Sequence, residues 1–208
     1  MAAGVARGRL PDTQHHLPQR RRSARGPSGF LRYGETEWAD LEAAVAYAVG
    51  HGSDGVVLFG DSMGGGIIES FLLRSEHAED VRAVVLDAPM LNFSRTVDDN
   101  AAREPLVGPL TVPASLTWAA KTITSFRYDV EWSALNYLGD GLDAAPTLIV
   151  HGDHDLTVPI GTSRDAAARH PGTVTLVECP GADHIECWNL DPKKMQRLVT
   201  DFLAGALS

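Results

Sequence analysis

The chain has 208 residues, 44% of them hydrophobic, which suits one globular domain because single hydrophobic cores extend to about 250 residues. Its net charge of −9 argues against a nucleic-acid partner. The sequence holds no apolar run of about 18 residues and no apolar segment behind its N-terminal arginines, so we expect neither a membrane span nor a secretory signal peptide.

Two cysteines, Cys179 and Cys187, are too few for a disulfide framework, so we expect a reducing compartment and a cytoplasmic protein. We interpret Cys187 as a small packing residue. The charge is unevenly distributed, because residues 1–32 hold seven arginines and one acid, Asp12, and the rest of the chain therefore carries −15. Such a start is typical of a disordered tail, and we place one domain at 29–208, after a segment 1–28 that stands apart.

The first predicted element is a helix over residues 36–49. Trp38, Leu41 and Val45 fall on one of its faces, and glycines follow its last residues. The run "GVVLFG" comes next and is short, wholly apolar and rich in β-branched residues. This pattern is typical of a strand that is covered on both faces in a parallel sheet.

The later segments alternate between helix and strand patterns. Helices are expected for "IIESFLLRS", "IGTSRDAAARH" and the C-terminal stretch from "DPKK", and strands for "RAVVLDAP", "PTLIVHG" and "TVTLVECPG". The alternation predicts an α/β fold with a mainly parallel sheet flanked by helices.

Residues 92–140 interrupt the alternation. They hold several prolines and are too long for a simple connection, so we predict an inserted cap or lid. Two interpretations of its aromatic residues stay open, because they either line a substrate pocket or pack the insertion onto the sheet. These residues are Trp118, Phe126, Trp132 and Tyr137.

The most informative stretch is "LFGDSMGGG", residues 58–66, which contains a G-x-S-x-G pattern between a predicted strand and a predicted helix. Ser62 is then held on a sharp turn with a strained backbone, and we expect a Cβ at position 60 or 64 to clash there. Gly65 and Gly66 would let the helix pack tightly. Because a helix N-terminus carries partial positive charge, the Met63 N–H is the expected donor to an oxyanion.

A serine hydroxyl is a weak nucleophile, so it needs a base that a third group orients. In α/β sheets such groups lie on loops at the carboxyl ends of strands. After the third predicted strand, "HGDHDLTVP" offers Asp153 and Asp155, and after the fourth, "PGADHIE" offers His184. The chain order is therefore serine, acid, histidine, which is the order known from α/β-hydrolases.

From about residue 29 to its end, the sequence resembles the α/β-hydrolase superfamily. "LFGDSMGGG" is similar to the nucleophile elbow, "LIVHGDHDLTVP" to the family's "HGxxDxxVP" turn and "PGADHIECW" to its histidine loop. The resemblance implies a partial α/β-hydrolase fold with Ser62 as nucleophile, His184 as base and Asp155 as acid. Similar family members usually have a bulky residue where this chain has Asp61, which puts a charge beside the nucleophile.

Other interpretations of these residues exist. The side chains of His151, Asp153, His154 and Asp155 could be drawn as a metal cluster, but a tight turn rarely aims four such ligands at one ion. Asp87, after the second predicted strand, is an alternative acid, although we prefer Asp155.

Several further residues receive a structural interpretation. Asp183 cannot easily reach the ring of its neighbour His184. The remaining histidines are expected at the surface, namely His51, His77, His154 and His170.

The resemblance also predicts that part of the fold is missing. A complete α/β-hydrolase sheet has about eight strands, whereas we find four parallel strands after residue 55. One permissible coding of "HLPQRRRSA", shifted by one nucleotide, gives "TYRNDDEA", and relatives carry "TYRND" shortly before this "RYGETEW" segment. We hypothesise that residues 1 to about 25 are read out of frame, and we expect marginal stability or aggregation.

Two functions follow as hypotheses. The first is a serine hydrolase that cleaves an ester, thioester or amide of a small-molecule acyl substrate, without a metal or organic cofactor. The second is a truncated remnant whose site residues are inherited and idle. An aspartate nucleophile, as dehalogenases and epoxide hydrolases use on this fold, is disfavoured by Ser62. The sequence does not identify the acyl group.

Overall fold

The computed structural model describes residues 31–208, so the predictions for residues 1–28 lie outside the described part of the chain. Helices and strands predicted outside the insertion are present, with ends that differ by a few residues. The helices are α1 (Trp38–Gly50), α2 (Met63–Arg74), α3 (Phe93–Arg103), α4 (Ala114–Tyr128), α5 (Gly161–Arg169), α6 (Cys187–Leu190) and α7 (Pro192–Ala206). The strands are β1 (Val56–Asp61), β2 (Val81–Asp87), β3 (Pro105–Val107), β4 (Leu110–Thr111), β5 (Thr147–Gly152) and β6 (Val174–Cys179).

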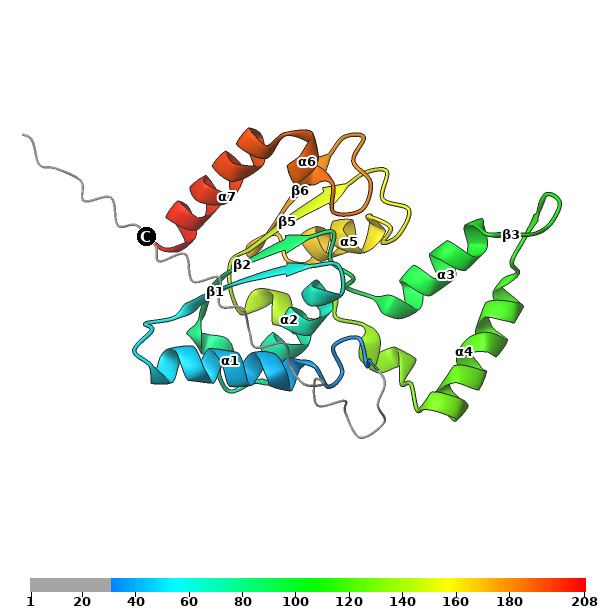
Figure 1. The fold of residues 1–208 in the computed structure, drawn as a ribbon, viewed down its shortest axis with the longest axis horizontal. Coiled ribbons are helices and arrows are strands. Elements are labelled where there is room, and N and C mark those ends of the chain that lie inside the picture. The colour runs from blue at the N-terminus through cyan, green and yellow to red at the C-terminus, as the bar shows by residue number, and fades with distance from the viewer. Residues whose placement is uncertain (1–30) are drawn as a thin grey trace, which may run out of the picture. The chain divides into compact units, whose positions relative to one another are not determined.

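The main sheet has four strands in the order β1-β2-β5-β6, and all three pairings are parallel. In Figure 1 the sheet runs through the middle of the described part, with α1 and α2 on one side and α7 on the other. This is the α/β arrangement that the alternation of strand and helix patterns predicted. Parallel strands cannot be joined by a tight turn and need a crossover connection. Helix α2 provides it between β1 and β2, and α5 provides it between β5 and β6.

Side chains of β2 alternate between two hydrophobic clusters, one on each face of the sheet. Val84 and Leu86 pack in the cluster that also holds Phe71 of α2. Val85 packs in the other, together with Met195 of α7. The period of two follows from the pleat of a strand, and burial on both faces explains why "RAVVLD" is almost wholly apolar.

Strand β1 differs from its prediction, because only one of its faces is covered. Leu58 is buried, whereas Val57 is 41% exposed and Phe59 57% exposed. Among the described residues β1 pairs with β2 alone and therefore forms an edge of the sheet. An apolar run thus indicated a strand correctly, but it did not distinguish a covered face from a bare one.

An edge strand with exposed apolar side chains is a template for pairing with another chain. We therefore expect the protein to self-associate through β1, and Phe59→Lys to shift it toward the monomer. Size-exclusion chromatography with light scattering measures this shift. Leu190→Lys is the matched control, since Leu190 is 56% exposed on α6. Equal association of wild type and Phe59→Lys would contradict the expectation.

The predicted insertion has secondary structure of its own. It contains α3, the β3–β4 hairpin and α4, which extend from the carboxyl end of the main sheet (Figure 1). Its aromatic residues differ in burial, and the interpretation that some of them line a substrate pocket stays a prediction. Tyr137 is buried and Phe93 stacks between Tyr33 and Trp132, with ring centroids 4.0 and 5.5 Å away, whereas Trp118 is 69% exposed.

One of the histidines expected at the surface is buried. His170 is buried rather than exposed, because its Nδ1 lies 2.8 Å from Asp143 Oδ1 where α5 packs onto the core. His51 and His154 are exposed as expected.

Within residues 31–208, no helix is long and apolar enough to cross a membrane.

Candidate active site

Ser62 occupies the turn between β1 and α2. Its backbone has φ 47° and ψ −116°, a conformation that non-glycine residues rarely adopt. Its N–H donates to the Asp87 carbonyl at 2.9 Å, and its own carbonyl accepts from the Met90 N–H at 2.8 Å. Neighbouring β2 and the loop after it thus hold the strained turn in place, and strain of this kind clusters at functional sites.

The glycines around Ser62 allow close packing, with one exception to the prediction. A Cβ at Gly60 would lie 2.7 Å from the Ile68 side chain and 2.9 Å from the Gly64 backbone, so a side chain there clashes as expected. A Cβ at Gly64 would meet Asp61 Oδ1 only at 3.7 Å, which is ordinary contact, so the expected clash at that position is wrong. The close approach is made by the Gly64 backbone and needs space at position 60.

The next two glycines bring the start of α2 against other loops, as predicted. A Cβ at Gly65 would lie 3.0 Å from the Pro89 backbone, and one at Gly66 3.0 Å from the Met90 carbonyl oxygen. Both added atoms would force the helix away from the loop that follows β2.

The structure brings three sequence-predicted side chains together at the carboxyl end of the sheet. His184 Nε2 lies 3.0 Å from Ser62 Oγ, and His184 Nδ1 lies 2.7 Å from Asp155 Oδ2. The Asp155 side chain is fully buried, whereas that of His184 keeps 19% of its surface exposed. A buried carboxylate, an imidazole and a partly accessible hydroxyl therefore form one hydrogen-bonded chain.

The environment of Asp155 favours its ionised form. Burial by itself raises the pKa of a carboxyl group, but hydrogen bonds from His151, His184 and the Val158 N–H hold the pKa of Asp155 below its ordinary value. Its Oδ1 accepts from the Thr157 and Val158 N–H groups, both at 2.8 Å. Asp155 can thus present a negative charge to the His184 ring.

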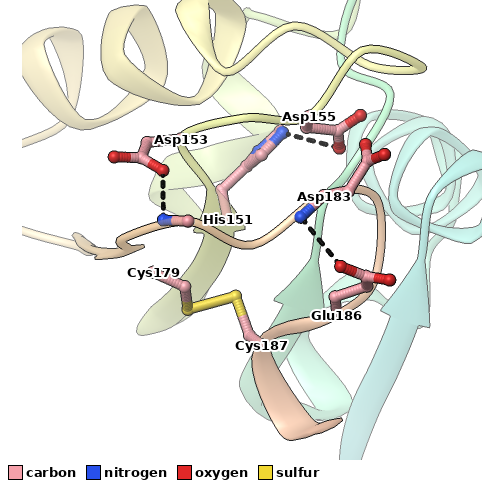
Figure 2. The surroundings of a disulfide bond; sticks show 8 residues. His151, Asp153, Asp155, Cys179, Asp183, Glu186 and Cys187 are labelled. Atoms are coloured by element: carbon pink, nitrogen blue, oxygen red, sulfur yellow. Dashed lines mark hydrogen bonds and ion pairs between the residues drawn. A yellow bond between two sulfur atoms is a disulfide. The ribbon is translucent and has the colours of Figure 1, made fainter. Parts of the chain in front are cut away.

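The loop that carries His184 is tied to the loop that carries Asp155. Asp183 Oδ1 accepts from the His184 N–H at 2.8 Å and from the Leu156 N–H at 3.2 Å. Asp153 Oδ1 accepts from the Gly181 N–H at 2.7 Å (Figure 2). As expected, Asp183 does not pair with its neighbour's ring, but sequence reasoning missed that it holds the backbone of both loops.

A disulfide joins the two ends of the His184 loop. Cys179 ends β6, Cys187 begins α6, and their Cα atoms are 5.7 Å apart (Figure 2). The interpretation of Cys187 as a packing residue is therefore wrong, because the loop folds back and brings two residues eight positions apart into bonding distance. The reducing compartment stays a prediction, now without the support of two unpaired cysteines.

Asp87, the alternative acid, does not contact His184. It is almost fully buried at the end of β2, and neither carboxylate oxygen has a hydrogen-bond partner among the described residues. Burial, partly opposed by His151, raises the pKa of Asp87 to about 6. Geometry thus favours Asp155 as the partner of the histidine.

The alternative metal cluster is not assembled. His151 and Asp155 point into the interior, whereas Asp153 and His154 are exposed. In residues 31–208 no group of three or more His, Cys, Asp or Glu side chains could hold a metal ion.

His151 is the residue whose place the sequence did not reveal. It is fully buried and contacts Ser163 Oγ at 2.7 Å, the Val158 carbonyl at 2.8 Å and Asp155 Oδ2 at 3.3 Å (Figure 2). A histidine next to the apolar run Leu148–Val150 in a fully buried strand was the available signal, because buried polar side chains require partners.

Comparison with known proteins adds the family. A family model described as alpha/beta hydrolase fold matches residues 34–187. The chain belongs to this family. The comparison with curated proteins found no match.

Solved structures of two esterases and of an α/β fold family hydrolase share the fold. The Pyrococcus furiosus esterase Pf2001 has 20% identity and a TM-score of 0.59 over 84% of this chain and 64% of its own length. The Rhodococcus esterase RhEst1 has 18% identity and a TM-score of 0.53, with 86% and 74% covered. A Bacillus anthracis α/β fold family hydrolase has 18% identity and a TM-score of 0.57, with 83% and 75% covered. This α/β hydrolase chain thus spans less than two thirds of the Pyrococcus esterase.

Proposed function

We propose that the protein is a serine hydrolase that cleaves an ester, thioester or amide bond through a covalent acyl-enzyme. The observation that carries the proposal is the pair of hydrogen bonds made by one imidazole, with 3.0 Å from His184 Nε2 to Ser62 Oγ and 2.7 Å from Nδ1 to Asp155 Oδ2. Both distances lie in the range in which a base can accept a hydroxyl proton while an acid fixes its tautomer. Membership in the α/β hydrolase family and the esterase folds support it further.

Each residue has a defined role in this proposal. His184 Nε2 takes the Ser62 proton as the oxygen attacks the acyl carbon, and then gives that proton to the leaving group. Water then enters, loses a proton to His184 and attacks the acyl carbon. His184 returns that proton to Ser62 Oγ as the bond to the acyl group breaks, which releases the acid and restores the hydroxyl. Asp155 stabilises the imidazolium that forms in each half of the reaction.

In this proposal the N–H of Met63 donates the hydrogen bond that stabilises the oxyanion. Met63 is the first residue of α2, and the first N–H groups of a helix have no partner within it. Such a donor sits next to Ser62 and gains from the partial positive charge of the helix end. Removing one oxyanion donor costs about 10²–10³ in kcat, so an enzyme with this donor alone would be slow.

Covalent labelling of Ser62 tests the proposal without a known substrate. Wild-type protein should react with a fluorophosphonate probe, and Ser62→Ala should lose both the labelling and the hydrolysis of 4-nitrophenyl acetate. Ser70→Ala, which removes a buried hydroxyl from the same helix, should keep both.

The competing function is a non-catalytic remnant of a hydrolase. The edge position of β1 within residues 31–208, with Val57 and Phe59 exposed, favours this candidate. Folded wild-type protein that neither labels nor hydrolyses would support it and reject the serine hydrolase. Circular dichroism on the same sample establishes that the protein is folded.

A further inference from the structure

Behind the proposed active site, His151 lies within 3.3 Å of the Asp155 oxygen that also contacts His184. It is the penultimate residue of β5, is fully buried and has no access to a substrate. Three groups contact its ring, from the loop after β5 and from α5, namely Val158, Asp155 and Ser163. Burying a polar side chain is unfavourable unless hydrogen bonds compensate for the lost contacts with water. The three partners of His151 therefore indicate a role beyond filling space in the core.

The partners of the ring select one tautomer of the neutral imidazole. A carbonyl oxygen only accepts, so the 2.8 Å contact with Val158 places the proton on Nε2. In the neutral imidazole Nδ1 then carries a lone pair, and the Ser163 hydroxyl donates to it at 2.7 Å. Ser163 is itself fully buried on α5, so the hydroxyl holds one tautomer of His151.

The proton on Nε2 also faces the acid. Nε2 lies 3.3 Å from Asp155 Oδ2, and this is the same oxygen that accepts from His184. The other oxygen is held by the N–H groups of Thr157 and Val158. Every side of the carboxylate therefore has a donor, and the group cannot rotate without leaving one of them unpaired.

We propose that His151 is a positioning residue for the reaction, whose Nε2–H fixes the Asp155 loop and aims Asp155 Oδ2 at His184. The inference rests on the proposed function, because it assigns a role in the same serine chemistry. His151 bridges the carbonyl at the end of the loop and the carboxylate in its middle. Without this bridge the loop gains freedom, and the acid spends less time in contact with the imidazole.

Two amide substitutions separate the donor at Nε2 from the acceptor at Nδ1. The side-chain nitrogen of His151→Gln can occupy the Nε2 position and donate toward Val158 and Asp155. The shorter His151→Asn reaches the Nδ1 position, accepts from Ser163 and leaves Val158 and Asp155 without that donor. Both variants replace the ring by a neutral amide. A role in packing alone would lower their stability, more for the shorter Asn, but would leave kcat per folded molecule equal.

Hydrolysis of 4-nitrophenyl acetate is the assay. We expect His151→Asn to lower kcat about 10-fold to 100-fold, as for the loss of one buried hydrogen bond, with KM unchanged. His151→Gln should stay within about threefold of wild type. Equal kcat for the two variants, or a change in KM alone, would overturn the inference.

A variant that keeps His151 tests the inference even if the substitutions of His151 are unstable. Ser163→Ala keeps His151 and removes the donor that holds its tautomer, so it should lower kcat in the same direction as His151→Asn, again with KM unchanged. Proton NMR of the downfield imidazole N–H region gives a readout that needs no turnover. The His184 Nδ1–H signal should persist in His151→Gln and broaden in His151→Asn and Ser163→Ala; a signal unchanged in all three would also overturn the inference.

The two proposals fail in different ways. If wild-type protein is folded but does not label at Ser62, the serine hydrolase falls and the role of His151 falls with it. If wild type is active and Ser62→Ala is not, while the Gln and Asn variants match in kcat, only the role of His151 is rejected.

Discussion

Asp155→Asn is expected to lower kcat about 10⁴-fold, the loss seen when the acid of such a triad becomes an amide. The surrounding backbone makes this outcome specific. The N–H groups of Thr157 and Val158 both point at the position of Oδ1, so they hold the amide oxygen there. The amide nitrogen is then forced to the position of Oδ2, where it donates toward His184 Nδ1.

This exchange inverts the tautomer of the imidazole. Nδ1 becomes an acceptor, the proton moves to Nε2, and Nε2 can no longer accept the proton of Ser62. The Asp155 side chain is fully buried and out of reach of a substrate, so KM should change little. Steady-state kinetics with 4-nitrophenyl acetate measure both constants.

Asp153→Asn is the matched control for this prediction. Asp153 lies two positions away in the same loop and is exposed. Its carboxylate accepts a hydrogen bond from the Gly181 N–H. Its amide variant should keep kcat within about tenfold of wild type, since one exposed hydrogen bond contributes little. Similar losses in the two variants would indicate damage to the loop and would remove Asp155 from the mechanism.

Stability is expected to fall as the pH rises from about 4.5 to 8, because of one carboxyl group in α2. Glu69 is fully buried, and neither of its oxygens has a hydrogen-bond partner among the described residues. Burial raises the pKa of Glu69 to about 8 from an ordinary value of 4.5. The folded state therefore binds a proton that the unfolded state releases over this range.

The sign and size of the effect follow from that difference. Because the folded pKa is the higher one, the unfolded state binds fewer protons between the two values, and the free energy of unfolding decreases with pH. By pH 8 the decrease from this group is on the order of 4 kcal/mol, at about 1.4 kcal/mol per pH unit. A loss of this size is a large part of the stability of an ordinary domain.

Glu69→Gln removes the titration and keeps the shape of the side chain. Denaturant unfolding at pH 5, 6, 7 and 8 should show a much flatter dependence for this variant, which should exceed wild type in stability at pH 8. Asp87 contributes in the same direction, since burial raises its pKa to about 6, so some slope should remain. Glu79→Gln controls for the loss of an exposed carboxylate. Parallel curves for wild type and Glu69→Gln would contradict the prediction.

The sequence by itself determined the α/β class and the three residues of the proposed site. Strand and helix patterns are local, so the alternation from Val56 to Cys179 could be followed without knowing any contact. Ser62, His184 and the pair Asp153 and Asp155 stood where strands end, and the carboxyl ends of parallel strands lie at one edge of a sheet. The resemblance to α/β-hydrolases selected Asp155 from that pair. Their convergence was therefore foreseeable, although their separation in Å was not.

Features that depend on which residues contact each other in three dimensions were decided only by the tertiary structure. The bare face of β1 has the same apolar pattern as a covered one, because hydrophobicity records no neighbour. The Cys179–Cys187 bond depends on the path of the loop between them. Asp183 likewise acquires Leu156 as a partner only when two loops meet, and His151 acquires Val158 only when the loop after β5 folds back onto the strand. Such hydrogen bonds leave no periodic signal in the sequence.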